Sequence, residues 1–172
     1  RDAPGNRVGN TETWNGTSWT EVNDLNDDRG DLAGCGTNTA ALAFGGEDPG
    51  AGVKAVTESW NGTSWTEVND LNTARIFLAG AGTNTSALAI GGGIPGSSPR
   101  VALTESWNGA SWTEVNDLNI ARVLSAAGGS DNTSAIAFGG SDSIPAVLGA
   151  TEEWNANVAL GVWATSTSVN TA

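Results

Sequence analysis

Short runs of alternating apolar and polar residues dominate this chain. Thr, Val, Trp, Ile and Phe alternate with small or polar residues. A period of two is typical of strands, whose successive side chains point to opposite faces of a sheet. No segment carries the apolar period of an amphipathic helix over a useful length. The pattern predicts an all-β protein, with strands in the middle of the chain at about 76–82, 86–91, 101–107 and 111–117.

The same pattern recurs along the chain. A tryptophan returns at intervals of 46, 47 and 47 residues, at Trp14, Trp60, Trp107 and Trp154. The first three begin the motif WNGTSWTEVNDLN or WNGASWTEVNDLN, and the fourth begins an eroded copy, WNANVALGVW. A second block repeats in step, with an arginine, a run of small residues and a Gly-Gly pair. Its arginines are Arg29, Arg75 and Arg122. Asn-Gly between the two tryptophans predicts a tight hairpin, so each unit is expected to have four strands.

Four short strands per repeat, with paired glycines and periodic aromatics, predict a β-propeller blade. The order of the motifs resembles the kelch repeat: an arginine, a small-residue strand, a strand ending in Gly-Gly, a loop, Glu-x-Tyr-Asp, a turn and a tryptophan. The matching residues of the middle unit are Arg75, Ala87–Ile90, Gly91–Gly92, Glu105–Asn108 and Trp112. Trp-Asn replaces the usual Tyr-Asp. The resemblance covers nearly the whole chain and implies an all-β propeller of kelch-like four-stranded blades.

The repeated units together span residues 1–172, which we interpret as one kelch-like propeller domain. We expect a half blade at 1–26 and blades at about 29–72, 75–119 and 122–168, the last with eroded final strands. That makes about three and a half blades, whereas closed propellers usually have four to eight. Open sheet edges and apolar blade faces invite association. The expected partners are copies of the same chain in a homo-oligomer, or further propeller blades.

Near-identical repeats of WNGTSWTEVNDLNTAR that end in a TEEW unit also resemble the kelch-like repeat structural proteins of marine cyanophages. This resemblance implies a non-catalytic structural and binding module of a virion, associated with the tail or a fibre, and a virion or extracellular location. Such a module would contact virion proteins and host surface glycans. The alternatives are a free lectin-like carbohydrate-binding propeller and a kelch scaffold for a protein partner.

Most of the repeated residues are interpreted as structural. The tryptophans Trp14, Trp19, Trp60, Trp65, Trp107 and Trp112 are expected to pack between blades, with sugar stacking as the alternative. Glu58 and Glu105 lie two residues before a tryptophan, and a buried carboxylate needs a partner. We predict ion pairs between these glutamates and the repeated Arg29, Arg75 and Arg122, within one blade or between adjacent blades.

Charge and composition exclude several functions. Nineteen acidic residues against seven basic ones give a net charge of −12, so neither nucleic acid nor an anionic membrane surface is an expected partner. The chain has no histidine, which removes Ser-His-Asp and Cys-His nucleophile systems. We predict no enzyme activity and no cofactor. Cys35 is expected to be a small buried filler, whose counterparts are Ala81 and either Ala126 or Ala127.

One weak metal candidate and one candidate binding surface remain. Asp24, Asp27, Asp28 and Asp31 could supply oxygen ligands to calcium, with a solvated acidic loop as the alternative. The units diverge in the loops at residues 47–56, 93–103 and 141–150, and loops on a rigid scaffold commonly carry recognition. The alternative is neutral drift. The candidate ligand-binding residues are Glu47, Asp48, Lys54, Ser97, Ser98, Arg100, Asp142 and Ser143.

Overall fold

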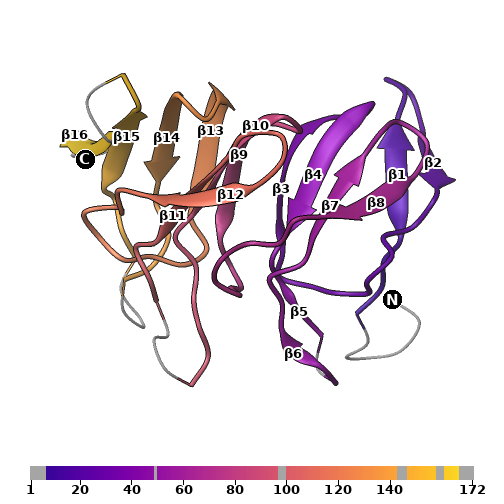
Figure 1. Cartoon of the computed structure of the whole chain (residues 1–172), viewed down its shortest axis with the longest axis horizontal. Coiled ribbons are helices and arrows are strands. Elements are labelled where there is room, and N and C mark those ends of the chain that lie inside the picture. Colours follow the sequence, from indigo (N-terminus) through magenta and orange to yellow (C-terminus); the bar gives the residue numbers. More distant parts are fainter. Residues whose placement is uncertain (1–6, 49, 97–99, 143–146, 158–160, 167–172) are drawn as a thin grey trace.

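The computed structural model describes residues 7–48, 50–96, 100–142, 147–157 and 161–166. These residues form strands, turns and connecting segments without a helix, which confirms the all-β prediction for the described part of the chain. No helix able to span a membrane is therefore found there. The strands (Figure 1) are β1 (Thr11–Trp14), β2 (Trp19–Val22), β3 (Ala33–Thr37), β4 (Ala40–Phe44), β5 (Glu47–Asp48), β6 (Gly52–Val53), β7 (Thr57–Trp60), β8 (Trp65–Val68), β9 (Ala79–Thr83), β10 (Ser86–Ile90), β11 (Thr104–Trp107), β12 (Trp112–Val115), β13 (Ala126–Asp131), β14 (Ser134–Phe138), β15 (Thr151–Asn155) and β16 (Val162–Ser166).

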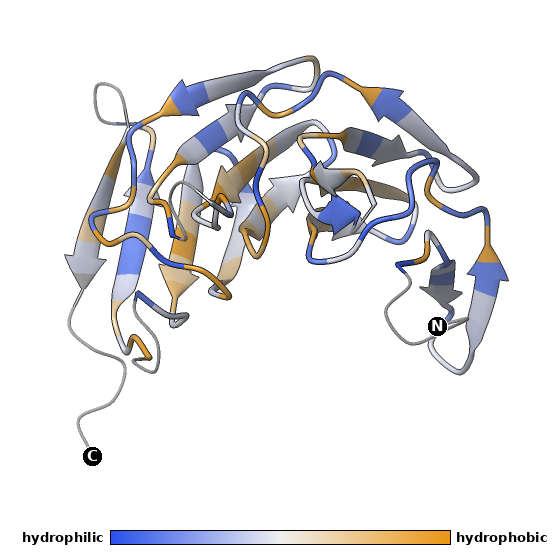
Figure 2. Cartoon of the chain, turned by 90° about the horizontal axis from the view of Figure 1, so that it is seen from below, coloured by the Kyte–Doolittle hydropathy of each residue, from blue (hydrophilic) through white to orange (hydrophobic). Residues whose placement is uncertain are grey.

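Within the described residues, three antiparallel sheets have four strands each. Their orders are β3-β4-β7-β8, β9-β10-β11-β12 and β13-β14-β15-β16, called here the first, middle and last sheets. β1 and β2 form a separate hairpin, and β5 and β6 form a short one between β4 and β7. β9 contacts both β3 and β13, so the first strands of the three sheets lie side by side. The sheets follow one another along an open arc, with the β1–β2 hairpin and the last sheet at its ends (Figure 2).

The four strands predicted for the middle unit are all present. β10 and β12 lie close to the predicted bounds, and β11 begins at Thr104 rather than at residue 101. β9 begins at Ala79 rather than at residue 76. Phe77 causes this difference, because its φ of 55° places it in the left-handed region, where a strand cannot continue. Ile76, just before it, makes an isolated bridge to Gly93 instead.

The last sheet is complete, which corrects the expectation that its final strands are eroded. β15 pairs with β16, and Trp154 lies opposite Trp163. In the middle sheet Trp107 lies opposite Trp112 in the same way. Trp163 therefore takes the position of Trp112, although it follows its partner by nine residues instead of five. That longer connection hid the equivalence in the sequence.

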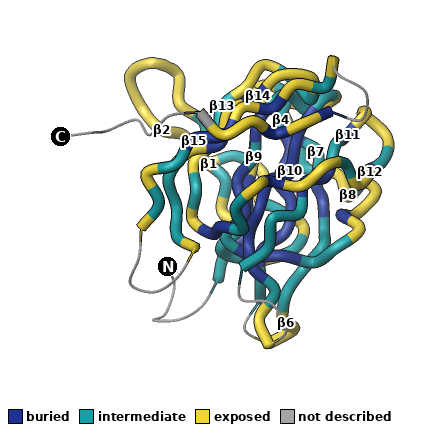
Figure 3. The backbone as a smooth tube through the Cα atoms, turned by 90° about the vertical axis from the view of Figure 1, so that its left-hand side faces the viewer, coloured by how far each residue is buried: buried dark blue, intermediate teal, exposed yellow. Residues whose placement is uncertain are grey.

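Apolar side chains fill the spaces between successive sheets. Between the first and middle sheets, the ring centroids of Phe44 and Trp112 are 5.0 Å apart. Between the middle and last sheets, Ile90 and Trp163 belong to one buried cluster. Buried residues are most frequent in the inner strands of the first and middle sheets, β4, β7, β10 and β11 (Figure 3). Gly80 permits this close packing, because a Cβ there would lie 2.7 Å from the carbonyl oxygen of Gly34 in β3.

Cys35 lies at the interface between the first and middle sheets. It is only partly buried, packs against the apolar cluster there, and its Sγ lies 3.7 Å from the carbonyl oxygen of Thr83. Burial raises the pKa of its thiol to about 12. The register pairs Cys35 with Leu42 and Gly128 with Ile136 at equivalent positions. Its counterpart in the last sheet is therefore Gly128, which corrects the expected Ala126 or Ala127.

Candidate functional site

A buried ion pair lies at the same place in each four-stranded sheet. The nitrogen–oxygen distances are 2.6 Å for Arg29–Glu58, 2.9 Å for Arg75–Glu105 and 2.6 Å for Arg122–Glu152. Each arginine precedes the first strand of its sheet, and each glutamate lies on the third strand of the same sheet. The predicted pairing is therefore present, within sheets rather than between them. Sequence interpretation missed Glu152, which the eroded TEEW motif places at the position of Glu105.

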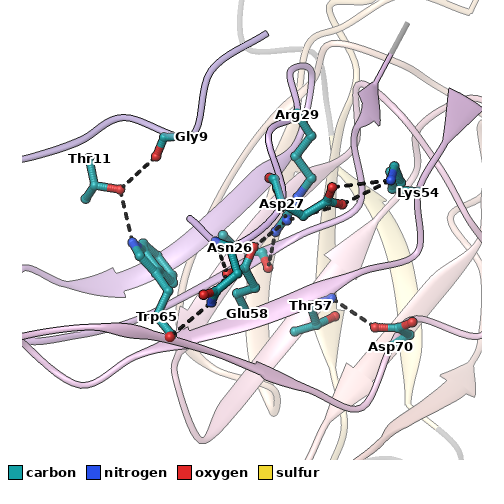
Figure 4. A network of polar contacts seen from close by, with 11 residues as sticks. Gly9, Thr11, Asn26, Asp27, Arg29, Lys54, Thr57, Glu58, Trp65 and Asp70 are labelled. Carbon is teal, nitrogen blue, oxygen red and sulfur yellow. Dashed lines mark hydrogen bonds and ion pairs between the residues drawn. The ribbon is translucent and has the colours of Figure 1, made fainter. Parts of the chain in front are cut away.

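An asparagine at the end of each NDLN motif binds the buried glutamate of the next sheet. The backbone nitrogen and Nδ2 of Asn72 donate to Oε2 of Glu105 at 2.7 and 2.8 Å. Nδ2 also donates to the carbonyl oxygen of Trp112 at 3.1 Å. Asn26 makes the same contacts with Glu58 (Figure 4). The exact repetition of this asparagine was the signal for its role, which the sequence interpretation did not use.

In the three four-stranded sheets, the first tryptophan of the motif binds within its own sheet. The indole nitrogens of Trp60, Trp107 and Trp154 each donate, at 3.0 to 3.1 Å, to a carbonyl oxygen of the turn that follows the first strand. All three side chains are buried. The predicted packing role holds for Trp60 and Trp107, because both the apolar ring and the polar N–H group are satisfied. Trp154, which was not among the predicted residues, packs in the same way.

In the three four-stranded sheets, the second tryptophan of the motif reaches back to the preceding sheet or hairpin. The indole nitrogen donates to a threonine hydroxyl in three pairs: Trp65 to Thr11 at 3.0 Å, Trp112 to Thr57 at 3.1 Å and Trp163 to Thr104 at 3.2 Å. Trp14 and Trp19 depart from the packing prediction, since they are 43% and 64% exposed. The described chain places no further sheet against the β1–β2 hairpin on that side.

The surface where the units diverge contains an apolar pocket of about 340 Å³. Its lining comes from the connections between sheets and from the loops after β10 and β14, namely Ile76, Phe77, Gly93, Pro95, Arg100, Val123, Leu124 and Ser141. The loops and the connections thus share one end of the molecule. Arg100 contributes the positive charge, and its Nε is buried without a hydrogen-bond partner among the described residues.

Left-handed residues connect the sheets beside this pocket. Asp31, Phe77 and Leu124 are equivalent positions, with φ of 56°, 55° and 57°. The backbone nitrogen of Phe77 donates to the carbonyl oxygen of Asp31, and that of Leu124 donates to Phe77. Such conformations are costly for bulky residues and concentrate at functional sites. The backbone geometry is repeated here, whereas the side chain changes from unit to unit.

The structure separates the predicted ligand-binding residues. Arg100 lies at the pocket, but Glu47 forms an ion pair with Arg7 at 2.9 Å and Lys54 forms one with Asp27 at 3.3 Å. Asp48 accepts a hydrogen bond from its own turn at the backbone nitrogen of Gly50. The remaining candidates are Asp142, which is exposed, and Ser97, Ser98 and Ser143, which lie outside the described residues.

The aspartates proposed for calcium do not come together. Asp24 accepts a hydrogen bond from the backbone nitrogen of Thr11, as Asp70 does from Thr57. Asp27 pairs with Lys54 and Asp31 pairs with Arg7, while Asp28 is exposed. No group of three or more possible metal-binding side chains is found in the described part of the chain. Nearby cations and a backbone amide take up three of the four carboxylates, so the calcium hypothesis is not supported by the geometry.

Comparison with known proteins identifies the architecture. No protein-family model and no curated protein matches the chain. A solved structure described as "Structure of YjhT" is similar, with a TM-score of 0.72 and 10% sequence identity over 99% of this chain. The chain spans 62% of the length of that structure. At this identity the likeness shows the fold alone: an all-β, β-propeller-like arrangement of four-stranded antiparallel sheets.

Proposed function

We propose that the chain is a non-catalytic structural and binding module, built as a kelch-like propeller of about three and a half blades. Its recognition surface is the pocket between Phe77, Leu124 and Arg100. The observation that carries the proposal is the contrast between repeated and variable positions. The arginines, glutamates, asparagines and tryptophans that hold the sheets are nearly the same in every unit, whereas the residues lining this pocket differ. Variable side chains on a repeated scaffold are typical of recognition.

A surface glycan is the ligand class that fits this pocket. Apolar side chains such as Phe77 can pack against the C–H face of a sugar ring, and a few placed polar groups then fix its orientation. Arg100 supplies several N–H donors for sugar hydroxyl or acidic groups. The resemblance of the WNGTSWTEVNDLN repeats to cyanophage structural proteins supports a virion role, with the module at a tail or fibre. A free lectin and a scaffold for a protein partner are the alternatives.

A non-enzymatic role is consistent with the chemistry of the chain. It has no histidine to act as a general base. Its single cysteine, Cys35, has a raised pKa and remains a thiol at neutral pH. A thiol is a much weaker nucleophile than a thiolate.

Glycan binding tests the proposal directly. The labelled chain is applied to an array of neutral and acidic oligosaccharides, and hits are titrated by calorimetry. We expect saturable binding that Phe77→Ser and Arg100→Gln each weaken about tenfold or more, as removal of a central contact does. Arg100→Gln should affect acidic glycans most.

The repeat itself provides a matched control. Thr17 is exposed in the first Asn-Gly turn, and the third copy has Ala110 at that position. Thr17→Ala should leave glycan binding unchanged. Absence of any bound glycan, or equal binding by all the variants, contradicts the proposed ligand. Co-purification with virus particles separates the virion role from a free lectin.

A further inference from the structure

The contact between successive sheets has a repeated centre. In the interface between the first and middle sheets, Trp112 donates to the hydroxyl of Thr57 at 3.1 Å and packs edge-on against Phe44. Phe44 and Thr57 lie opposite each other on β4 and β7, so they face the next sheet together. One indole thus occupies a binding site formed by a threonine and an apolar side chain of the preceding sheet, called here the indole site. Trp163 is bonded to Thr104 in the next interface in the same way.

The last sheet has the residues of the same indole site, but no tryptophan of the described chain occupies it. Phe138 and Thr151 lie opposite each other on β14 and β15, as Phe44 and Thr57 do. The Thr151 hydroxyl is buried and has no hydrogen-bond partner among the described residues. Phe138 is 41% exposed, whereas its counterpart Phe44 is 0% exposed. A hollow of about 440 Å³ lies next to this pair along β14 and β15, where it is lined in part by Ile136 and Glu153.

At the other end of the arc, an indole is not bound in any such site. Trp19 is 64% exposed, whereas Trp112 at the equivalent position is 5% exposed. The hairpin segment 11–22 differs from segment 104–115 only at Thr13 and Thr17, where the third copy has Ser106 and Ala110. The β1–β2 hairpin therefore presents nearly the same surface that β11–β12 uses to bind the first sheet.

We propose that the exposed face of the last sheet binds the β1–β2 hairpin of a second copy of this chain. Trp19 of one copy then donates to the Thr151 hydroxyl of the other and packs against Phe138. The contact continues the interface already formed twice within the chain. The two surfaces differ, so association is head to tail and can extend to a ring or a filament. This proposal does not depend on the proposed glycan binding.

Charge opposes the association between copies and provides a further test of it. Each copy carries a net charge of −12, so added salt should strengthen the contact by screening repulsion. Glu153 lies on the same face as Phe138, where the other units have Ser59 and Ser106. Glu153→Ser should therefore strengthen association by removing a negative charge from the docking surface.

Sedimentation and light scattering over a concentration series test the interface. We expect the mass to rise above the 17.3 kDa of one chain, and Trp19→Ser and Phe138→Ser each to weaken association about tenfold or more. Both side chains are exposed, so both variants should fold. Val147, 85% exposed in a loop, provides the control Val147→Ser, which should associate like the unchanged chain.

Mixing the two defective variants is the decisive measurement. The Trp19→Ser chain retains the indole site at Phe138, and the Phe138→Ser chain retains the indole of Trp19. A mixture should therefore form a one-to-one dimer that neither variant forms alone. A monodisperse monomer at high concentration, or association that only one of the two substitutions weakens, overturns the proposal. Failure of the mixture to form a dimer does the same.

Discussion

The β1–β2 and β11–β12 hairpins have almost the same sequence but different surroundings. Their internal geometry is alike, since the tryptophan ring centroids are 5.4 Å apart in the first and 5.3 Å apart in the second. Yet Trp112 is buried against the first sheet and Trp19 is mostly exposed. The local sequence therefore forms the hairpin, and the neighbouring sheet decides whether its tryptophan contributes to a core. Substitutions at equivalent positions can measure that difference.

The largest effect is expected in the fully enclosed middle sheet, at Arg75. Arg75→Met leaves Glu105 buried without its ion pair, and such a loss costs about 3–5 kcal/mol of unfolding free energy. Urea unfolding measures the cost. Replacing both residues with apolar ones should restore part of the stability, because no isolated charge then remains. An unchanged unfolding midpoint for Arg75→Met would show that the pair does not stabilise the sheet.

The two tryptophans test the comparison itself. Trp112→Ala removes a buried ring and its bond to Thr57, so we expect a loss of about 3–5 kcal/mol. Trp19→Ala removes an exposed ring and should change the unfolding free energy by less than about 0.5 kcal/mol. Both variants are measured at low protein concentration, where copies do not associate. Equal losses would mean that the β1–β2 hairpin is buried in solution.

Two threonines offer a matched pair with a smaller effect. Thr104 accepts the bond from Trp163, so Thr104→Val leaves a buried N–H group unpaired and should cost about 1–3 kcal/mol. Thr151→Val removes a buried hydroxyl that has no partner in the described chain, and should be neutral or stabilising. Thermal unfolding of the monomer compares them. A larger loss for Thr151→Val would indicate a partner for its hydroxyl.

The smallest effect concerns the thiol at the first interface. The pKa of Cys35 rises on folding from 9.0 to about 12, so folding favours the protonated thiol. Its contribution to stability is complete below pH 9 and is lost as the pH rises towards 12, because the unfolded chain ionises first. Cys35→Ala should reduce the loss of stability above pH 9. At pH 8, iodoacetamide should label Cys35 slowly until the chain unfolds; rapid labelling of the folded chain would contradict this.

The buried part of the candidate site was more predictable than the pocket. The Arg–Glu pairs follow from period and alternation, because both partners belong to one unit and face the same side. The ion pairs of Glu47 and Lys54 could not be predicted in this way. Their partners, Arg7 and Asp27, are about 40 and 27 residues away and match no repeated position, so only the folded chain brings them together.

The sequence alone determined the repeated unit: four strands, tight Asn-Gly turns and one buried ion pair. These features depend on local alternation, on residues that tolerate turns, and on contacts within one repeat. The tertiary structure decided which copies of a repeated residue are buried and which are exposed. It also decided that Phe77 and Leu124 adopt left-handed conformations beside a pocket. The physical reason is that burial and pocket shape depend on the neighbouring sheet, and identical motifs at the middle and the ends of the arc have different neighbours.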